Sequence, residues 1–74
     1  MTRVAVVGAT GYVGGRLVPR LLELGYEVVA VSRSLTKLRA RSWSENPLVI
    51  LRAADATSPS SLAQALEGCA QAFY

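Results

Sequence analysis

The feature that most constrains this chain is a series of spaced glycines directly after a short apolar run. Residues 4–7 read Val-Ala-Val-Val, and Gly8, Gly11 and Gly14 follow. A buried strand that breaks into glycines and then into a helical pattern is typical of a phosphate-binding turn. Glycine lets the chain turn sharply, lets a phosphate approach the bare backbone, and lets the next helix pack closely. The helix that follows would direct its free N–H groups and positive dipole end at the ligand.

The glycine spacing also indicates which kind of ligand to expect. The pattern is Gly8-x-x-Gly11-x-x-Gly14, one residue longer in its first interval than the common dinucleotide fingerprint G-x-G-x-x-G. The alternative is a tight strand–helix turn that binds nothing. Three spaced glycines and a threonine exceed what a bare turn needs, and the strand and helix on either side supply the required context. The motif therefore predicts a dinucleotide site.

Alternating strand and helix patterns along the chain predict an α/β fold. Strands are expected over residues 3–7, 27–31, 48–51 and 71–74, since their apolar residues are consecutive, as is typical of parallel strands covered on both faces. Between them lie a helical pattern, a polar stretch with a weak helix on Leu35 and Leu38, and a helix opened by Ser58-Pro59. The order predicts a Rossmann-type parallel sheet with strand order 3-2-1-4 and helices on both faces.

The helical pattern over residues 12–24 is amphipathic. Its expected apolar stripe contains Val13, Leu17, Leu21 and Leu24, and Val18 and Leu22 widen it. Gly25 provides the stop. Pro19 lies inside the pattern, where a proline costs about 3 kcal/mol, so we expect a local bend within one continuous helix.

The composition favours part of a larger core. The 74 residues are 51% hydrophobic, whereas a domain this small buries only about 60% of its unfolded surface. The chain also stops in an apolar run. We therefore expect residues 1–74 to be the N-terminal part of a single, apparently truncated dinucleotide-binding domain.

Charge and cysteine content exclude several classes of protein. Half of the eight positively charged residues lie in one short stretch, at Arg33, Lys37, Arg39 and Arg41. The simplest interpretation of this stretch is a solvent-exposed face or loop. Apart from Trp43 it lacks interleaved aromatic residues, so no nucleic-acid partner is expected. No run reaches the ~18 apolar residues of a membrane span, so no membrane partner is expected either. The lone Cys69, expected to be a small buried hydrophobe, gives no sign of an oxidising compartment, and the cytoplasm is the expected location.

The end of the second strand indicates which dinucleotide is preferred. Many NAD-binding chains carry an acid about 20 residues after the glycines, where it accepts a bond from the ribose 2′-hydroxyl. Here Arg33 stands nineteen residues beyond Gly14. A guanidinium cannot accept that bond, but its planar fork suits a 2′-phosphate, and Ser32, Ser34 and Lys37 can add donors. NADP(H) is therefore the preferred cofactor, with NAD(H) as the alternative. The other interpretation of Arg33 is an ordinary exposed arginine after a strand, with no role in binding.

Five further residues complete the candidate site. The hydroxyl of Thr10 can meet a phosphate or cap the helix, and Tyr12 and Val13 present backbone N–H groups at the helix start. Asp55, with Ala56 behind it, follows the third strand. Its carboxylate can accept from the adenine amino group or cap the turn into the next helix.

The glycine motif, Arg33 and Asp55 together resemble the N-terminal part of the short-chain dehydrogenase/reductase superfamily. The resemblance is closest to its extended and atypical branches, the epimerase-like and NmrA-like proteins, and covers the first quarter to third of a typical member. It implies that Gly8, Gly11 and Gly14 line the pyrophosphate, that Arg33 meets the 2′-phosphate, and that Asp55 meets the adenine.

Two functions remain open from the sequence. The first is the cofactor half of an NAD(P)-dependent oxidoreductase or epimerase with a small-molecule substrate; the second is a non-catalytic, NmrA-like dinucleotide sensor. Enzymes of the superfamily use a Tyr-x-x-x-Lys pair, and this chain has none, so no catalytic residue is assigned. An exposed sheet edge also offers a surface for self-association.

Overall fold

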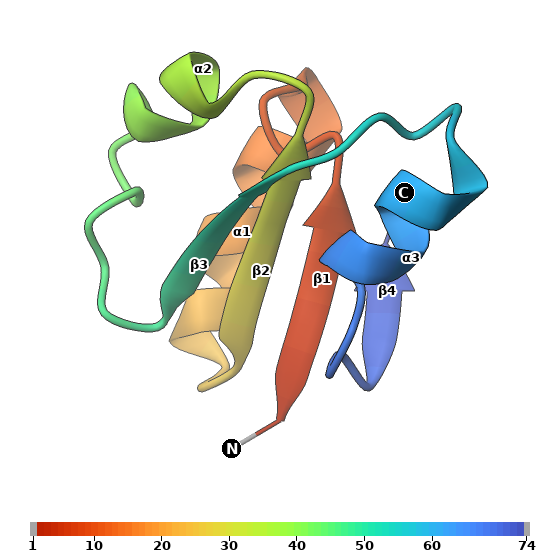
Figure 1. Ribbon diagram of the computed structural model, residues 1–74. Helices are drawn as coiled ribbons and strands as arrows, with labels where there is room; N and C mark the ends of the chain where they lie inside the picture. Colours follow the sequence, from red (N-terminus) through yellow and green to blue (C-terminus); the bar gives the residue numbers. More distant parts are fainter. Residues whose placement is uncertain (1, 74) are drawn as a thin grey trace.

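The chain forms a four-stranded parallel sheet flanked by three helices over residues 2–73, the part that this computed structural model describes (Figure 1). The elements are β1 (Arg3–Val7), α1 (Tyr12–Glu23), β2 (Glu27–Ser32), α2 (Leu35–Arg39), β3 (Val49–Ala53), α3 (Pro59–Ala65) and β4 (Gln71–Phe73). The strand order is β3-β2-β1-β4, and every neighbouring pair is parallel. The predicted Rossmann-type topology and its 3-2-1-4 order are therefore confirmed.

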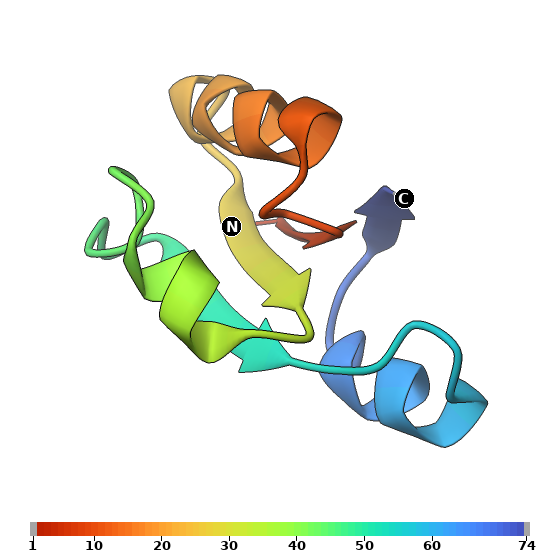
Figure 2. The same ribbon diagram turned by 90° about the horizontal axis from the view of Figure 1, so that it is seen from above.

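The sheet has a separate core on each face, because successive residues of a strand point to opposite sides. On one face, Val4 and Val6 of β1 pack with α1, α2 and the buried Trp43. On the other, Ala5 and Val29 pack with Ala65 of α3. Seen from above, α1 and α3 lie on opposite sides of the sheet (Figure 2). The prediction of helices on both faces is confirmed.

The helix α1 keeps Pro19 in its interior and ends at Glu23, before Gly25 turns the chain with φ +87°. Its apolar face is narrower than the sequence pattern predicts. Val18 and Leu21 are buried, but Val13 is 72% and Leu24 58% exposed. Those two positions were wrongly assigned to the buried stripe, because Val13 lies in the first turn, beside the glycine turn, and Leu24 lies beyond the last helical residue.

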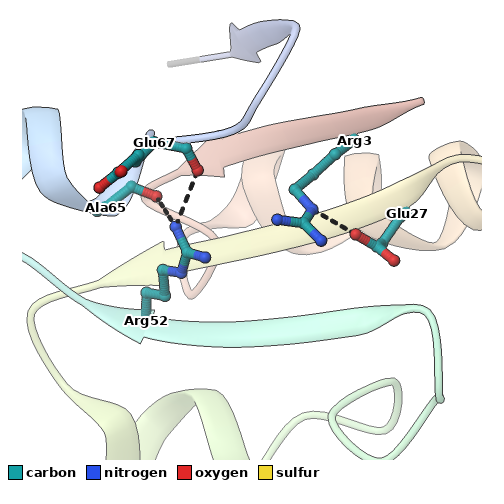
Figure 3. Close-up of polar contacts among 5 residues, drawn as sticks. All are labelled: Arg3, Glu27, Arg52, Ala65 and Glu67. Atoms are coloured by element: carbon teal, nitrogen blue, oxygen red, sulfur yellow. Dashed lines mark hydrogen bonds and ion pairs between the residues drawn. The ribbon is translucent and has the colours of Figure 1, made fainter. Parts of the chain in front are cut away.

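The third strand runs further than its apolar residues predict. It was expected over residues 48–51, whereas β3 spans Val49–Ala53 and pairs Arg52 with Val31 of β2. A charged residue fits inside the strand because its guanidinium leaves the sheet on the α3 side. There Arg52 Nη1 donates to the carbonyls of Ala65 at 2.8 Å and Glu67 at 3.3 Å (Figure 3).

One ion pair and two of the sequence expectations concern the edges of the core. Arg3 forms an ion pair with Glu27 across the neighbouring strands β1 and β2 (Figure 3). Cys69 is only partly buried and packs against the α3-side core, so it is less enclosed than expected. The last strand, expected to reach Tyr74, is seen to Phe73, and Tyr74 lies outside the described residues.

None of the helices within residues 2–73 has the length and hydrophobicity needed to cross a membrane. The same residues contain no group of three or more His, Cys, Asp or Glu side chains that could hold a metal ion.

Candidate functional site

The glycine turn links the carboxyl end of β1 to α1 and is fastened to β2. Gly8 has φ +77°, a left-handed conformation that side chains rarely adopt. The backbone N–H groups of Gly8 and Ala9 both donate to Val31 O, at 2.9 and 3.0 Å. Gly11 N then closes the turn on Gly8 O at 2.9 Å. The turn therefore lies against the end of the neighbouring strand.

Close approach of the backbone requires glycine at position 14 and leaves only slightly less than ordinary space at position 11. A Cβ placed on Gly14 would lie 2.4 Å from Gly8 O and 3.0 Å from Ala9 Cα. A Cβ on Gly11 would lie 3.2 Å from Gly8 O, tighter than ordinary contact. Gly14 thus lets α1 pack directly on the backbone of the turn, the role expected of the last glycine in such a motif.

The first turn of α1 keeps its backbone N–H groups free of side-chain caps. Its N-cap is Gly11, and no side chain of the described chain bonds to that cap. By contrast, Ser34 caps α2 and Ser58 caps α3. One alternative for Thr10, capping this helix, is therefore wrong. Uncapped N–H groups at Tyr12 and Val13 suit an anionic ligand.

A cleft of about 310 Å³ opens beside the glycine turn, at the carboxyl ends of β1, β2 and β3. Five predicted site residues line it: Gly8, Ser32, Arg33, Asp55 and Ala56. They come from three separate strand–loop junctions, which the parallel topology brings to one edge of the sheet (Figure 1). Ligands of open α/β sheets bind at this edge.

A smaller hollow of about 160 Å³ lies on the other side of the same turn. Gly8 borders both spaces, and Gly11, Val13 and Gly14 line the smaller one together with Phe73 of β4. The two spaces adjoin the single turn that a pyrophosphate would contact. An extended ligand can therefore cross Gly8 from one space to the other.

Three predicted site residues line neither space. Thr10 Oγ1 lies 3.2 Å from Ser32 Oγ, so these two hydroxyls join the glycine turn to the end of β2. The Tyr12 ring is 78% exposed, and its hydroxyl accepts from Arg16 at 2.7 Å. The side chain of Lys37 is exposed on α2. The structure thus does not bring Lys37 into the cleft beside Arg33.

The carboxylate of Asp55 caps a turn in the loop after β3. Its Oδ1 accepts from Thr57 N at 2.9 Å and from Thr57 Oγ1 at 2.6 Å. The Thr57 hydroxyl, the Thr57 N–H group and the nearby Arg33 charge lower the pKa of Asp55. Of the two alternatives for this residue, the turn is realised in the structure. Within the described chain Oδ2 has no hydrogen-bond partner, and Asp55 is one of the residues that line the cleft.

Thr57→Val is expected to raise the pKa of Asp55 toward its ordinary value, because the hydroxyl bond is the largest cause of the shift. A carboxyl pKa that is lower in the folded state stabilises folding above the unfolded-state value, and this stabilisation is lost as the pH falls through the folded-state value. NMR titration of the Asp55 side-chain carbon measures the change. Thr57→Ser keeps the hydroxyl and is the matched control; an unchanged pKa in Thr57→Val would contradict the assignment.

The sequence analysis missed two residues that shape the site. Thr57 holds Asp55 and lines the cleft; the signal was the Asp-x-Thr spacing, which is typical of side-chain-capped turns. Arg41, in the loop after α2, donates through Nη2 to Thr10 O in the glycine turn. Its charge was noted only as part of a basic stretch, since nothing local shows that this loop folds back onto the turn.

A parallel sheet whose central strand ends in a glycine turn beside this cleft defines a Rossmann-type nucleotide-binding protein. The sequence profile of the NAD(P)H-binding family matches residues 8–74, and the chain belongs to that family. Its ligand is accordingly a nicotinamide dinucleotide. The predicted relationship to the short-chain dehydrogenase/reductases is confirmed by the relatives described next.

Three relatives illustrate this kinship. Divinyl chlorophyllide a 8-vinyl-reductase, chloroplastic, from Zea mays is 39% identical over 66 residues, covering 82% of this chain and 16% of the maize protein. Vestitone reductase from alfalfa (Medicago sativa) superposes with a TM-score of 0.77 at 32% identity, covering 97% of this chain and 24% of that one. A short-chain dehydrogenase/reductase family oxidoreductase from Aeromonas hydrophila superposes at 0.76 and 25% identity, covering 93% and 35%. The chain thus spans about a sixth to a third of these relatives' lengths.

Proposed function

We propose that the chain binds NADP(H) in preference to NAD(H) and forms the cofactor half of a reductase or epimerase. The observation that carries this proposal is the position of Arg33. It lines the cleft at the end of β2, next to Gly8 and within electrostatic reach of Asp55. A guanidinium there matches a 2′-phosphate, whereas NAD-preferring sites of this fold place an acid at the end of β2.

Different residues of the site would bind different parts of the dinucleotide. Gly8, Gly11 and Gly14 shape the pyrophosphate turn, and the N–H groups of Tyr12 and Val13 face the phosphates. Arg33 meets the 2′-phosphate with donors from Ser32 and Lys37, although Lys37 must swing toward the cleft to take part. Asp55 Oδ2 accepts from the adenine amino group, which Ala56 borders, while Oδ1 stays on Thr57.

An enzyme is favoured over a sensor because the three relatives are named as reductases or as an oxidoreductase. The hydride chemistry would belong to the nicotinamide, and this chain would position it. A non-catalytic, NmrA-like binding protein is the alternative. Assaying NADPH oxidation by the full-length protein separates the two, since a sensor binds without turnover.

Arg33→Ser is expected to weaken binding of 2′,5′-ADP by about ten- to a hundredfold, the loss of one or two charge-assisted bonds. Binding of 5′-AMP, which lacks the 2′-phosphate, should be unchanged. Isothermal titration or NMR titration of the chain with both nucleotides measures the ratio directly.

Arg39→Ser is the matched control, because it removes the same charge from an exposed position on α2 outside the cleft. An equal loss of affinity for both nucleotides, or the same loss in the control, would show that Arg33 does not read the 2′-phosphate. The preference for NADP(H) would then be wrong, while dinucleotide binding itself would stand.

Four wider expectations accompany this proposal. Residues 1–74 would be the N-terminal part of a single dinucleotide-binding domain, and a small molecule would be the substrate of the whole protein. Self-association would use the edge strand β3, which pairs only with β2 among the described strands. The cytoplasm is the proposed location; of the relatives, the maize reductase is named as chloroplastic.

A further inference from the structure

An arginine from a loop distant in the sequence contacts the glycine turn. Arg41 follows α2, and its Nη2 donates to the carbonyl of Thr10 in the middle of the turn. The same guanidinium lies over the start of α1: a Cβ on Gly15 would lie 3.6 Å from Nη1 and 3.7 Å from Cζ of Arg41. These are ordinary contact distances, so the guanidinium packs directly beside the backbone of Gly15.

This contact fixes one particular peptide plane. Thr10 O and Gly11 N–H belong to the same trans peptide unit and point in opposite directions. Gly11 N–H donates to Gly8 O at 2.9 Å, and Thr10 O accepts from Arg41, so the unit is held at both ends. Rotation of this plane would break the Gly8–Gly11 turn. It would also turn the N–H group of Gly11, the N-cap residue of α1, away from Gly8 O.

The turn is held on its other side by β2. Val31 O accepts from Gly8 and Ala9, and the Thr10 hydroxyl lies 3.2 Å from that of Ser32. Those contacts set where the turn begins. Arg41 acts further along, at the Thr10 carbonyl, where the chain enters α1.

We infer that Arg41 is a positioning residue for the pyrophosphate: it holds the glycine turn in its phosphate-accepting shape from the loop after α2. The inference rests on the proposed dinucleotide site. It adds that two arginines of the basic stretch 33–41 have different roles in binding. Arg33 acts at the ribose end of the cofactor, and Arg41 acts through the backbone of the turn. The two arginines should therefore differ in which part of the ligand they affect.

The test compares Arg41→Met and Arg41→Lys with the parent chain, using NADH, NADPH and 2′-AMP as ligands. Arg41→Met should weaken NADH and NADPH by the same factor, about tenfold, because both carry the pyrophosphate. Binding of 2′-AMP, which has no pyrophosphate, should be retained. Arg41→Lys should recover part of the loss, since an ammonium still donates to a carbonyl. Thermal unfolding of the unliganded variants should match that of the parent chain.

Other patterns overturn the inference in distinguishable ways. A loss confined to NADPH and 2′-AMP would make Arg41 a direct reader of the 2′-phosphate. Equal loss of all three ligands with a lower unfolding temperature would make it a purely structural residue. Unchanged binding would mean that the bond to Thr10 O has no effect on the site. Failure of the proposed function looks different, because the parent chain itself would then bind neither dinucleotide.

Discussion

Gly14→Ala is expected to destabilise the chain by about 3 kcal/mol or more, the upper range for overpacking a core. The added methyl would stand 2.4 Å from Gly8 O and 3.0 Å from Ala9 Cα, and both are backbone atoms that no rotamer change can move. The helix α1 must then shift away from the end of β1. Urea unfolding followed by circular dichroism measures the free energy of unfolding, and dinucleotide binding should be lost with the geometry of the turn.

Gly15→Ala is the matched control for this substitution. It makes the same chemical change one residue along the same helix, but its Cβ would contact Ala9 O at an ordinary 3.5 Å. Alanine is favoured over glycine within a helix by about 1 kcal/mol, so this variant should be neutral or more stable. Equal destabilisation of the two variants would show that the collision with the turn is not the cause.

Gly11→Val is expected to remove dinucleotide binding, with a loss of affinity on the order of a hundredfold or more, while the chain stays folded. The backbone of Gly11 is extended, with φ −76° and ψ 173°, which valine adopts readily. Its Cβ would lie 3.2 Å from Gly8 O, so the turn must give slightly. The branched side chain would then stand where the phosphate approaches the backbone. Titration with NADPH measures the loss.

A graded series separates the steric effect from damage to the fold. Gly11→Ala places a single methyl at the same site and should cause a smaller loss of affinity than valine. The unfolding temperatures of both variants should stay near that of the parent chain. Full affinity in Gly11→Val would contradict the phosphate-turn interpretation, since the side chain would then not be in the ligand's path.

The sheet could be predicted because its strands are apolar on both faces. Val28, Val29 and Ala30 of β2 are all fully buried, and a short apolar run bounded by turn residues is typical of a parallel strand covered on both faces. Where a strand departs from that rule, the prediction was less accurate: Arg52 lies within β3 because α3 supplies carbonyls for its guanidinium. The periodicity of α1 also could not show which turns lie over the sheet, so Val13 was placed in the core although it is exposed.

The candidate site was predictable as far as its residues lie next to strand ends. Gly8, Arg33 and Asp55 each follow a strand, and parallel topology alone brings them to one edge. The contacts that hold these residues in place are harder to predict from the sequence. The return of Arg41 to the glycine turn depends on the path of an irregular loop, which no periodic pattern describes. The capping of Asp55 by Thr57 is local but competes with adenine recognition, and only the geometry shows that one oxygen serves the turn.

The position of β1 in the sheet has a consequence for how the chain is made. This central strand pairs with β2, which follows soon after it, and with β4, the last of the described strands. During synthesis on the ribosome, one edge of β1 stays without its partner until residues 71–73 have emerged. An unpaired apolar edge is a template for association with other chains. Until β4 docks, the open edge of β1 is therefore available for association between nascent chains.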